Sequence, residues 1–174
     1  EGHNTISDFT DLERERENTI YNHLMHAKWH NNKINIIDTP GFDDFIGEVV
    51  SSLKVSDTAL ILLNAASGVE VGTEIVWEYV QNYQTPALFV INQMDHPKAD
   101  YDTTLEQAKN RFGNKVIPIQ YPYNSGEKFN SIIDVLRMTM YVFPENGGKP
   151  EKMPIPTSEL EKANALHNAL VEAA

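Results

Sequence analysis

The chain contains the sequence Ile34-Asn35-Ile36-Ile37-Asp38-Thr39-Pro40-Gly41-Phe42, in which an apolar run leads into a polar turn. The β-branched residues 34–37 predict a buried strand of an α/β sheet, which would deliver the following loop to the sheet edge where ligands bind. A carboxylate at Asp38 can hold a hydrated magnesium ion, and at Gly41 a backbone N–H can approach a phosphate because no side chain intervenes. Taken alone, the stretch also fits a strand followed by an ordinary Pro-Gly turn.

A second strand and polar loop lie at residues 88–95, where Leu88-Phe89-Val90-Ile91 is followed by Asn92-Gln93-Met94-Asp95. A carboxylate suits guanine, because the N1–H and the exocyclic amine of that base form a pair of donors, and an Asn amide can steady the ring. Taken alone, the tetrapeptide also fits a helix cap or a turn. Two such loops on successive strands favour one purine nucleotide, held at its phosphate end by the first loop and at its base by the second.

Several segments resemble the GTPase domain of translational GTPases, namely Ser7 to Ile20, Asp38 to Phe45 and Asn92 to Asp95. The segment Val116 to Pro122, with Phe129 to Tyr141 after it, resembles the insert that elongation factor G carries in that domain. The ordered set covers essentially all 174 residues and resembles elongation factor G or a close paralogue. The resemblance implies a parent protein that binds and hydrolyses GTP, uses GTP or GDP with Mg²⁺, and works on the ribosome in translocation.

The same resemblance implies roles for individual residues. Thr19 matches the threonine of the first switch region, whose hydroxyl and carbonyl sense magnesium and the terminal phosphate. Asp38 would also hold the magnesium ion. The residues expected to contact the nucleotide are Asp38, Thr39, Pro40, Gly41, Asn92, Gln93 and Asp95.

The chain departs from the family pattern near each end of the expected nucleotide. Phe42 stands where the family has a histidine that orients the attacking water, and a phenyl ring neither donates nor accepts that hydrogen bond. Loss of such a group costs a factor of about 10² to 10⁴ in rate. Glu17-Asn18 replaces Gly-Ile before the switch threonine, and Gln93 replaces a lysine whose stem lies along the base. We therefore predict slow or absent hydrolysis in the parent, with nucleotide binding better preserved. The alternative function is a GTP-binding ribosome factor that hardly hydrolyses GTP.

The expected fold is a P-loop GTPase-like α/β domain with a mostly parallel sheet, an antiparallel hairpin and a small α+β insert. Residues 1–113 would form a partial GTPase core with both switch regions and the guanine loop, and residues 114–174 an incomplete insert. The core is expected to begin with a short helix capped by Asp8. A hairpin follows, with strands at 20–29 and 33–38 and a turn at Asn31-Asn32. Helices are expected at 45–53, 73–83 and 105–112, of which the last ends at Gly113, and buried strands at 58–65 and 87–91.

In the expected insert, residues 116–121 and 138–143 read as strands, and Ile132, Ile133 and Leu136 as the apolar face of a short helix. Residues 144–156 read as an exposed connection because they are rich in Pro, Gly and Lys. A final helix follows, with an apolar line of Leu160, Ala163, Leu166 and Leu170.

No Gly-x-x-x-x-Gly-Lys-Ser/Thr phosphate loop occurs in the 174 residues, and the expected last guanine-contacting loop does not occur either. We expect a piece that begins within the first switch region and stops inside the insert, without the first strand of the fold. Such a fragment would be inactive alone, would hold no GTP or Mg²⁺, and would bind GTP no better than roughly millimolar. Its unpaired sheet edge would invite self-association.

Composition limits the remaining function classes. The net charge of −11 argues against independent nucleic-acid binding by this chain. The sequence has no cysteine, no apolar stretch of membrane-spanning length and no signal-like amino terminus, which favours the cytoplasm and no membrane contact. An unrelated α/β binding module with chance motifs remains the other hypothesis.

Overall fold

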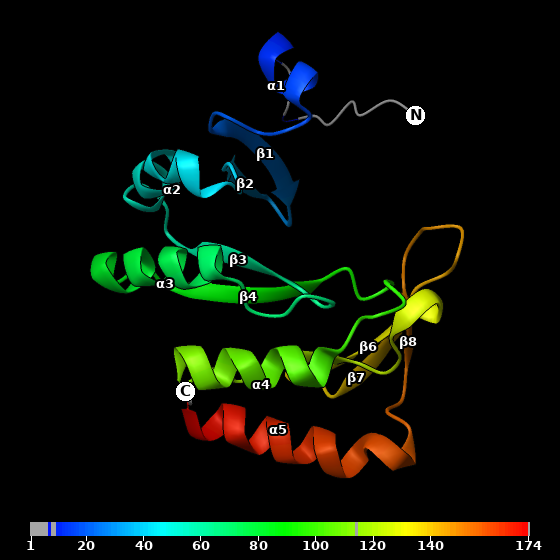
Figure 1. The fold of residues 1–174 in the computed structure, drawn as a ribbon. Helices are drawn as coiled ribbons and strands as arrows, with labels where there is room; N and C mark the ends of the chain where they lie inside the picture. The colour runs from blue at the N-terminus through cyan, green and yellow to red at the C-terminus, as the bar shows by residue number, and fades with distance from the viewer. Residues whose placement is uncertain (1–6, 8–9, 114, 174) are drawn as a thin grey trace. The chain divides into compact units, whose positions relative to one another are not determined.

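The computed structural model describes residues 7, 10–113 and 115–173. The chain divides into two compact units, and each is described by itself: the first is Glu1–Ile61 with Val71–Leu88, and the second is Leu62–Glu70 with Phe89–Ala174. The helices and strands make an α/β fold, as the sequence predicts (Figure 1). Among the described residues, no helix combines the length and the apolar character that crossing a membrane requires.

The first unit begins with the short helix α1 (Asp11–Arg16). Thr10 caps this helix, because its side chain accepts a hydrogen bond from the Glu13 N–H while the Glu13 carboxylate accepts one from the Thr10 N–H. This reciprocal pair is a capping box, which a Thr-x-x-Glu spacing favours. The sequence-based prediction placed the cap at Asp8, which lies outside the described residues. The cap of α1 in the structure is Thr10.

An antiparallel hairpin follows, formed by β1 (His23–Trp29) and β2 (Asn32–Asp38). Its loop is His30-Asn31, with φ angles of 44° and 66°, as a tight type I′ turn requires. The hairpin is as predicted, but the turn lies one residue earlier than expected, since Asn32 already pairs with Trp29. The strand was also expected to be buried, whereas Ile34 and Ile36 are 46% and 44% exposed. In the described residues β2 pairs with β1 alone.

After the hairpin, the 3-10 turn η1 (Asp43–Phe45) leads into α2 (Ile46–Leu53), and α3 (Val71–Tyr83) packs against α2. Val49 and Leu53 of α2 are buried, one turn apart on the same helix face. The sequence predicted this helix correctly to within one residue. Its stability comes from burying that apolar stripe, because an isolated helix of this length is marginal in water.

The strands β3 (Ala59–Asn64) and β4 (Ala87–Asn92) pair with each other. The Ala59 N–H donates to the Pro86 carbonyl and the Ala65 N–H donates to the Asn92 carbonyl, so both strands run in the same direction. The predicted parallel pairing is therefore confirmed. The prediction of burial on both faces was wrong for the described residues, because Leu60 and Leu62 are 63% and 58% exposed while their neighbours along β3 are buried.

The second unit holds α4 (Tyr101–Phe112), a four-stranded antiparallel sheet and α5 (Leu160–Ala173). Gly113 ends α4 with a φ of 96°, as predicted. The sheet order is β5 (Gln120–Pro122), β6 (Ser131–Asp134), β7 (Thr139–Val142) and β8 (Glu151–Met153), and the 3-10 turns are η2 (Gly126–Lys128) and η3 (Thr157–Glu159). Figure 1 shows α5, in red, running alongside α4. The core residues of this unit are Tyr121, Ile133, Val135, Met140, Ile155 and Ala163.

Three predictions for this unit were wrong in whole or in part. The strand expected at residues 116–121 is limited to β5, which begins only at Gln120. Ile132 and Ile133 lie in the strand β6 and not on a helix face, because β6 pairs with both β5 and β7 and β-branched residues suit such a pairing. The stretch 144–156, expected to be an exposed connection, is exposed over most of its length. It also contains the strand β8, which was not predicted and which pairs with β7 from Met153 to Glu151.

Candidate functional site

The loop predicted to face a phosphate begins where β2 ends, at Asp38. Asp38 and Thr39 are half-buried, Pro40 is buried and Gly41 is exposed. A methyl group built at Gly41 would meet no other atom within 4 Å, so the backbone of this loop is open to close approach. A carboxylate and an open backbone N–H on one short loop fit a hydrated Mg²⁺ ion and a phosphate oxygen.

Phe42 lies at the exposed end of this loop. Its side chain is 56% exposed, and its backbone carbonyl accepts a hydrogen bond from the Phe45 N–H at 3.0 Å. The backbone of Phe42 therefore starts the turn η1, while the ring contributes little to the core. A histidine at this position would need no repacking.

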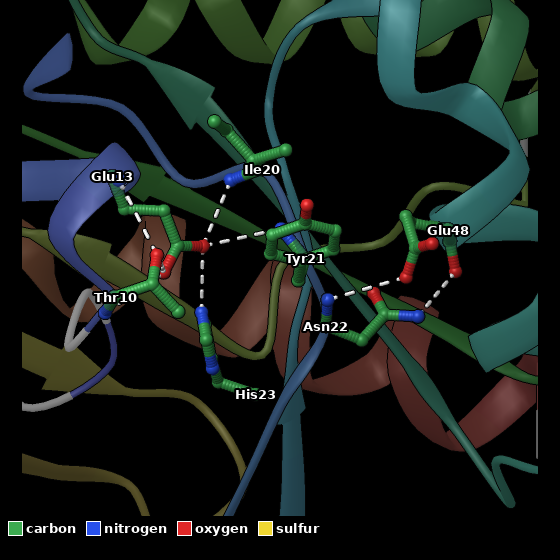
Figure 2. A network of polar contacts seen from close by, with 7 residues as sticks. All are labelled: Thr10, Glu13, Ile20, Tyr21, Asn22, His23 and Glu48. Carbon is green, nitrogen blue, oxygen red and sulfur yellow. Dashed lines mark hydrogen bonds and ion pairs between the residues drawn. The ribbon is translucent and has the colours of Figure 1, made fainter.

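Thr19 is half-buried and precedes β1. The backbone directly after it is held by one carboxylate, because the N–H groups of Ile20 and Tyr21 donate to Oε1 of Glu13 at 3.0 and 3.2 Å (Figure 2). Glu17, at the end of α1, has a φ of 55° and is exposed. The switch threonine proposed from the sequence is thus flanked by a left-handed turn on one side and a fixed backbone on the other.

The Glu13 side chain is fully buried, with 0% exposure. Besides the two backbone donors, it accepts a 2.6 Å hydrogen bond from the Thr10 hydroxyl and lies 2.8 Å from Nε2 of His23. Burial by itself would raise the pKa of Glu13, but the hydrogen bonds from Thr10, Ile20, His23 and Tyr21 outweigh it and lower the pKa to about 2. Glu13 is therefore an ionised carboxylate surrounded by donors.

The loop predicted to read the base begins where β4 ends, at Asn92. Gln93 adopts a left-handed conformation with a φ of 58°, and its carbonyl accepts a hydrogen bond from the His96 N–H at 3.0 Å. Met94 is buried, whereas Asn92, Gln93 and Asp95 are exposed. Met94 thus anchors a tight turn that presents the polar side chains around it to solvent.

Two neighbouring segments of the second unit form hydrogen bonds to this loop. Asn64, at the end of β3, donates from Nδ2 to Oε1 of Gln93 at 2.9 Å, and its own Oδ1 accepts the N–H of Ala66 at 2.8 Å. The Gly126 N–H donates to the Met94 carbonyl at 2.8 Å. The side-chain amide of Gln93, the residue that departs from the family lysine, is therefore held by Asn64.

The structure brings the predicted residues together in two sets. Asp38 to Phe42 share one loop, and Thr19 belongs to the same unit; Asn92, Gln93 and Asp95 share the other loop, in the second unit. Sequence reasoning missed the residues that support these segments, which are Glu13, His23, Glu48 and Asn64. The Thr-x-x-Glu spacing at residues 10–13 was a usable signal for Glu13, and nothing local marked the other supporting residues.

Comparison with known proteins gives a consistent result. The family described as the elongation factor Tu GTP binding domain matches residues 1–172. Elongation factor G of Mycoplasma genitalium is 37% identical over 171 residues, which is 97% of this chain and 25% of that protein. An elongation factor G-like protein of Thermotoga maritima is 32% identical over 165 residues, which is 95% of this chain and 23% of that protein.

A solved structure agrees with the sequence comparisons. A crystal structure of a protein from Thermus thermophilus superposes with a TM-score of 0.88 at 27% identity, over 97% of this chain and 25% of that one. The chain thus spans about a quarter of the length of the relatives that it matches. Since the family match extends over nearly every residue, the chain belongs to the elongation factor Tu GTP binding domain family.

Proposed function

We propose that this chain is the GTP-binding part of a longer translation elongation factor of the elongation factor G type, which acts on ribosomes in the cytoplasm. The observation that carries this proposal is the family match over residues 1–172 in a chain with polar loops directly after β2 and β4. The identity to elongation factors G of other organisms supports the assignment to this branch of the family. Residues 1–113 would be the partial GTPase core and residues 114–174 the insert.

In this proposal the loop that follows β2 binds the phosphate end of the nucleotide. Thr19 and Asp38 hold Mg²⁺, and the loop of Thr39, Pro40 and Gly41 approaches the terminal phosphate. When bound, magnesium would neutralise part of the phosphate charge. The open backbone at Gly41 and the half-buried carboxylate of Asp38 fit this role.

The other loop is proposed to bind the base. Asp95 accepts hydrogen bonds from N1–H and the exocyclic amine of guanine, and Asn92 steadies the ring. Gln93 lies against the base less firmly than a lysine, because its stem is shorter and it carries no charge. All these side chains are exposed, as binding requires.

A second candidate function is a ribosome factor that binds GTP as a switch and hardly hydrolyses it. Phe42 favours this function, since the exposed ring at this position cannot orient a water molecule by a hydrogen bond. Glu17 adds to it, because a carboxylate near the phosphates would oppose tight closure of the first switch region.

Single-turnover GTP hydrolysis by the parent protein with ribosomes distinguishes the two functions. Phe42→His is compared with the wild type, and nucleotide affinity is measured in parallel. We expect Phe42→His to raise the rate by about 10² or more with little change in GTP affinity, because a general acid–base group contributes rate and not ground-state binding. Ordinary ribosome-stimulated turnover by the wild type would refute the hydrolysis-deficient function.

The 174-residue chain by itself is proposed to bind GTP only at about millimolar concentration, because its sequence holds no phosphate loop. It is also proposed to self-associate, through the exposed Leu60 and Leu62 of β3. Titration calorimetry and concentration-dependent sedimentation of this chain test these statements. Micromolar GTP binding, or a monomer at every concentration, would contradict them.

A further inference from the structure

The three consecutive backbone N–H groups directly before β1 all donate to glutamate carboxylates. Ile20 and Tyr21 donate to Oε1 of Glu13, and Asn22 donates to Oε2 of Glu48 at 3.2 Å. Glu13 belongs to α1 and Glu48 belongs to α2, so the two carboxylates come from segments that are far apart in the sequence. Figure 2 shows the two carboxylates on either side of this backbone.

Side-chain contacts strengthen the attachment at both ends. Asn22 donates from Nδ2 to the Glu48 carbonyl at 2.9 Å and to the Ser51 hydroxyl at 3.3 Å. These hydrogen bonds connect residue 22 to the backbone and a side chain of α2. On the other side, the Thr10 hydroxyl and His23 both contact the buried carboxylate of Glu13. Hydrogen bonds to an ionised carboxylate are about twice as strong as neutral ones. Residues 20–22 are therefore hydrogen-bonded both to α1 and to α2.

We propose that Glu13 and Glu48 are positioning residues that couple α1 to α2 through the backbone of residues 20–22. This inference rests on the proposed function. It takes α1 with Thr19 as the first switch region and α2, which follows the loop of Asp38 to Phe42, as the second. Thr19 directly precedes the coupled backbone, so movement of either helix is transmitted to it. In GTPases the terminal phosphate orders both switch regions through its own contacts. The coupling adds a direct connection between the two regions through residues 20–22.

The first experiment needs no nucleotide. Hydrogen–deuterium exchange is measured in the parent protein for peptides that cover α1 and α2, in the wild type, Glu13→Ala and Glu48→Ala. We expect each variant to speed exchange in both helices by about tenfold or more, the effect of losing charge-assisted hydrogen bonds to backbone groups. Glu15→Ala is the matched control, because Glu15 is an exposed residue of α1. Faster exchange confined to the helix that carries the substitution would overturn the coupling.

The second experiment uses milder variants and a readout that simple loss of stability does not move. Glu13→Gln and Glu48→Gln keep a carbonyl acceptor but lose the charge, and the ratio of GTP to GDP affinity is measured with Mg²⁺ by titration calorimetry. We expect this ratio to fall by about tenfold while GDP affinity stays within about twofold. If the wild-type parent prefers GTP and both variants keep the same ratio of GTP to GDP affinity, the coupling does not affect Thr19. A wild-type parent that does not bind GTP would count against the proposed function, and the exchange experiment would still decide the coupling.

Discussion

Nε2 of His23 lies 2.8 Å from Oε1 of Glu13, and the two side chains are only 5% and 0% exposed. The hairpin register places His23 directly opposite Asp38, the last residue of β2. His23 thus contacts the carboxylate that holds the backbone after Thr19 and also pairs with β2, which ends at Asp38. The buried pair therefore stabilises the attachment of α1, the proposed first switch region, to the hairpin.

Replacing Glu13 by Ala is expected to destabilise the parent protein by about 3 kcal/mol, because several donors would be left buried without an acceptor. Urea unfolding, followed by circular dichroism, measures this free energy. Glu15→Ala, an exposed change on the same helix, is expected to stay within about 0.5 kcal/mol of the wild type. Equal effects of the two substitutions would mean that the buried network does not stabilise the fold.

Acid is expected to remove the contribution of Glu13 to stability. The pKa of Glu13 is about 2 in the folded protein and has an ordinary value of 4.5. Since the folded state binds the proton more weakly, the stabilisation is complete above pH 4.5 and is lost as the pH falls to about 2. The stability difference between the wild type and Glu13→Gln should therefore shrink over that interval in urea unfolding at a series of pH values. A difference that is constant from about pH 6 to about pH 2 would contradict the lowered pKa.

Asn64→Ala is expected to weaken GTP binding by the parent about three- to tenfold, the effect of losing a hydrogen bond that orders the base-reading loop through Gln93. Titration calorimetry with GTP measures the change. Asn82→Ala is the matched control, since Asn82 is an exposed asparagine of α3. If both variants bind GTP like the wild type, Asn64 does not support the loop.

The sequence predicted the elements whose signals are local. The parallel strands β3 and β4, the hairpin and the end of α4 at Gly113 follow from runs of apolar residues and from turn-forming residues. The strand β6 was missed because Ile132 and Ile133 fit either a short helix or a strand, and pairing with β5 and β7 decides between them. Such pairing is a tertiary effect that local propensity does not contain.

The support of the candidate site was harder to predict for a related reason. Glu13 lies in a run of charged residues, which normally marks a solvated helix face. Its burial depends on backbone groups at residues 20 and 21 and on His23, which the hairpin brings to it. The loops that present Asp38 and Asn92 could be located from the sequence, whereas the side chains that hold these segments in place required the structure.

In the proposed function, Asp95 recognises the guanine base of the nucleotide that the parent protein binds. The most direct measurement compares the affinities of the parent protein for GTP and xanthosine triphosphate, in the wild type and in Asp95→Asn. Xanthine presents a carbonyl where guanine presents its exocyclic amine, so an amide at position 95 should accept xanthine and reject guanine. We predict that the wild type prefers GTP and that Asp95→Asn prefers xanthosine triphosphate, each by about tenfold or more. Unchanged GTP preference in Asp95→Asn would contradict the claim.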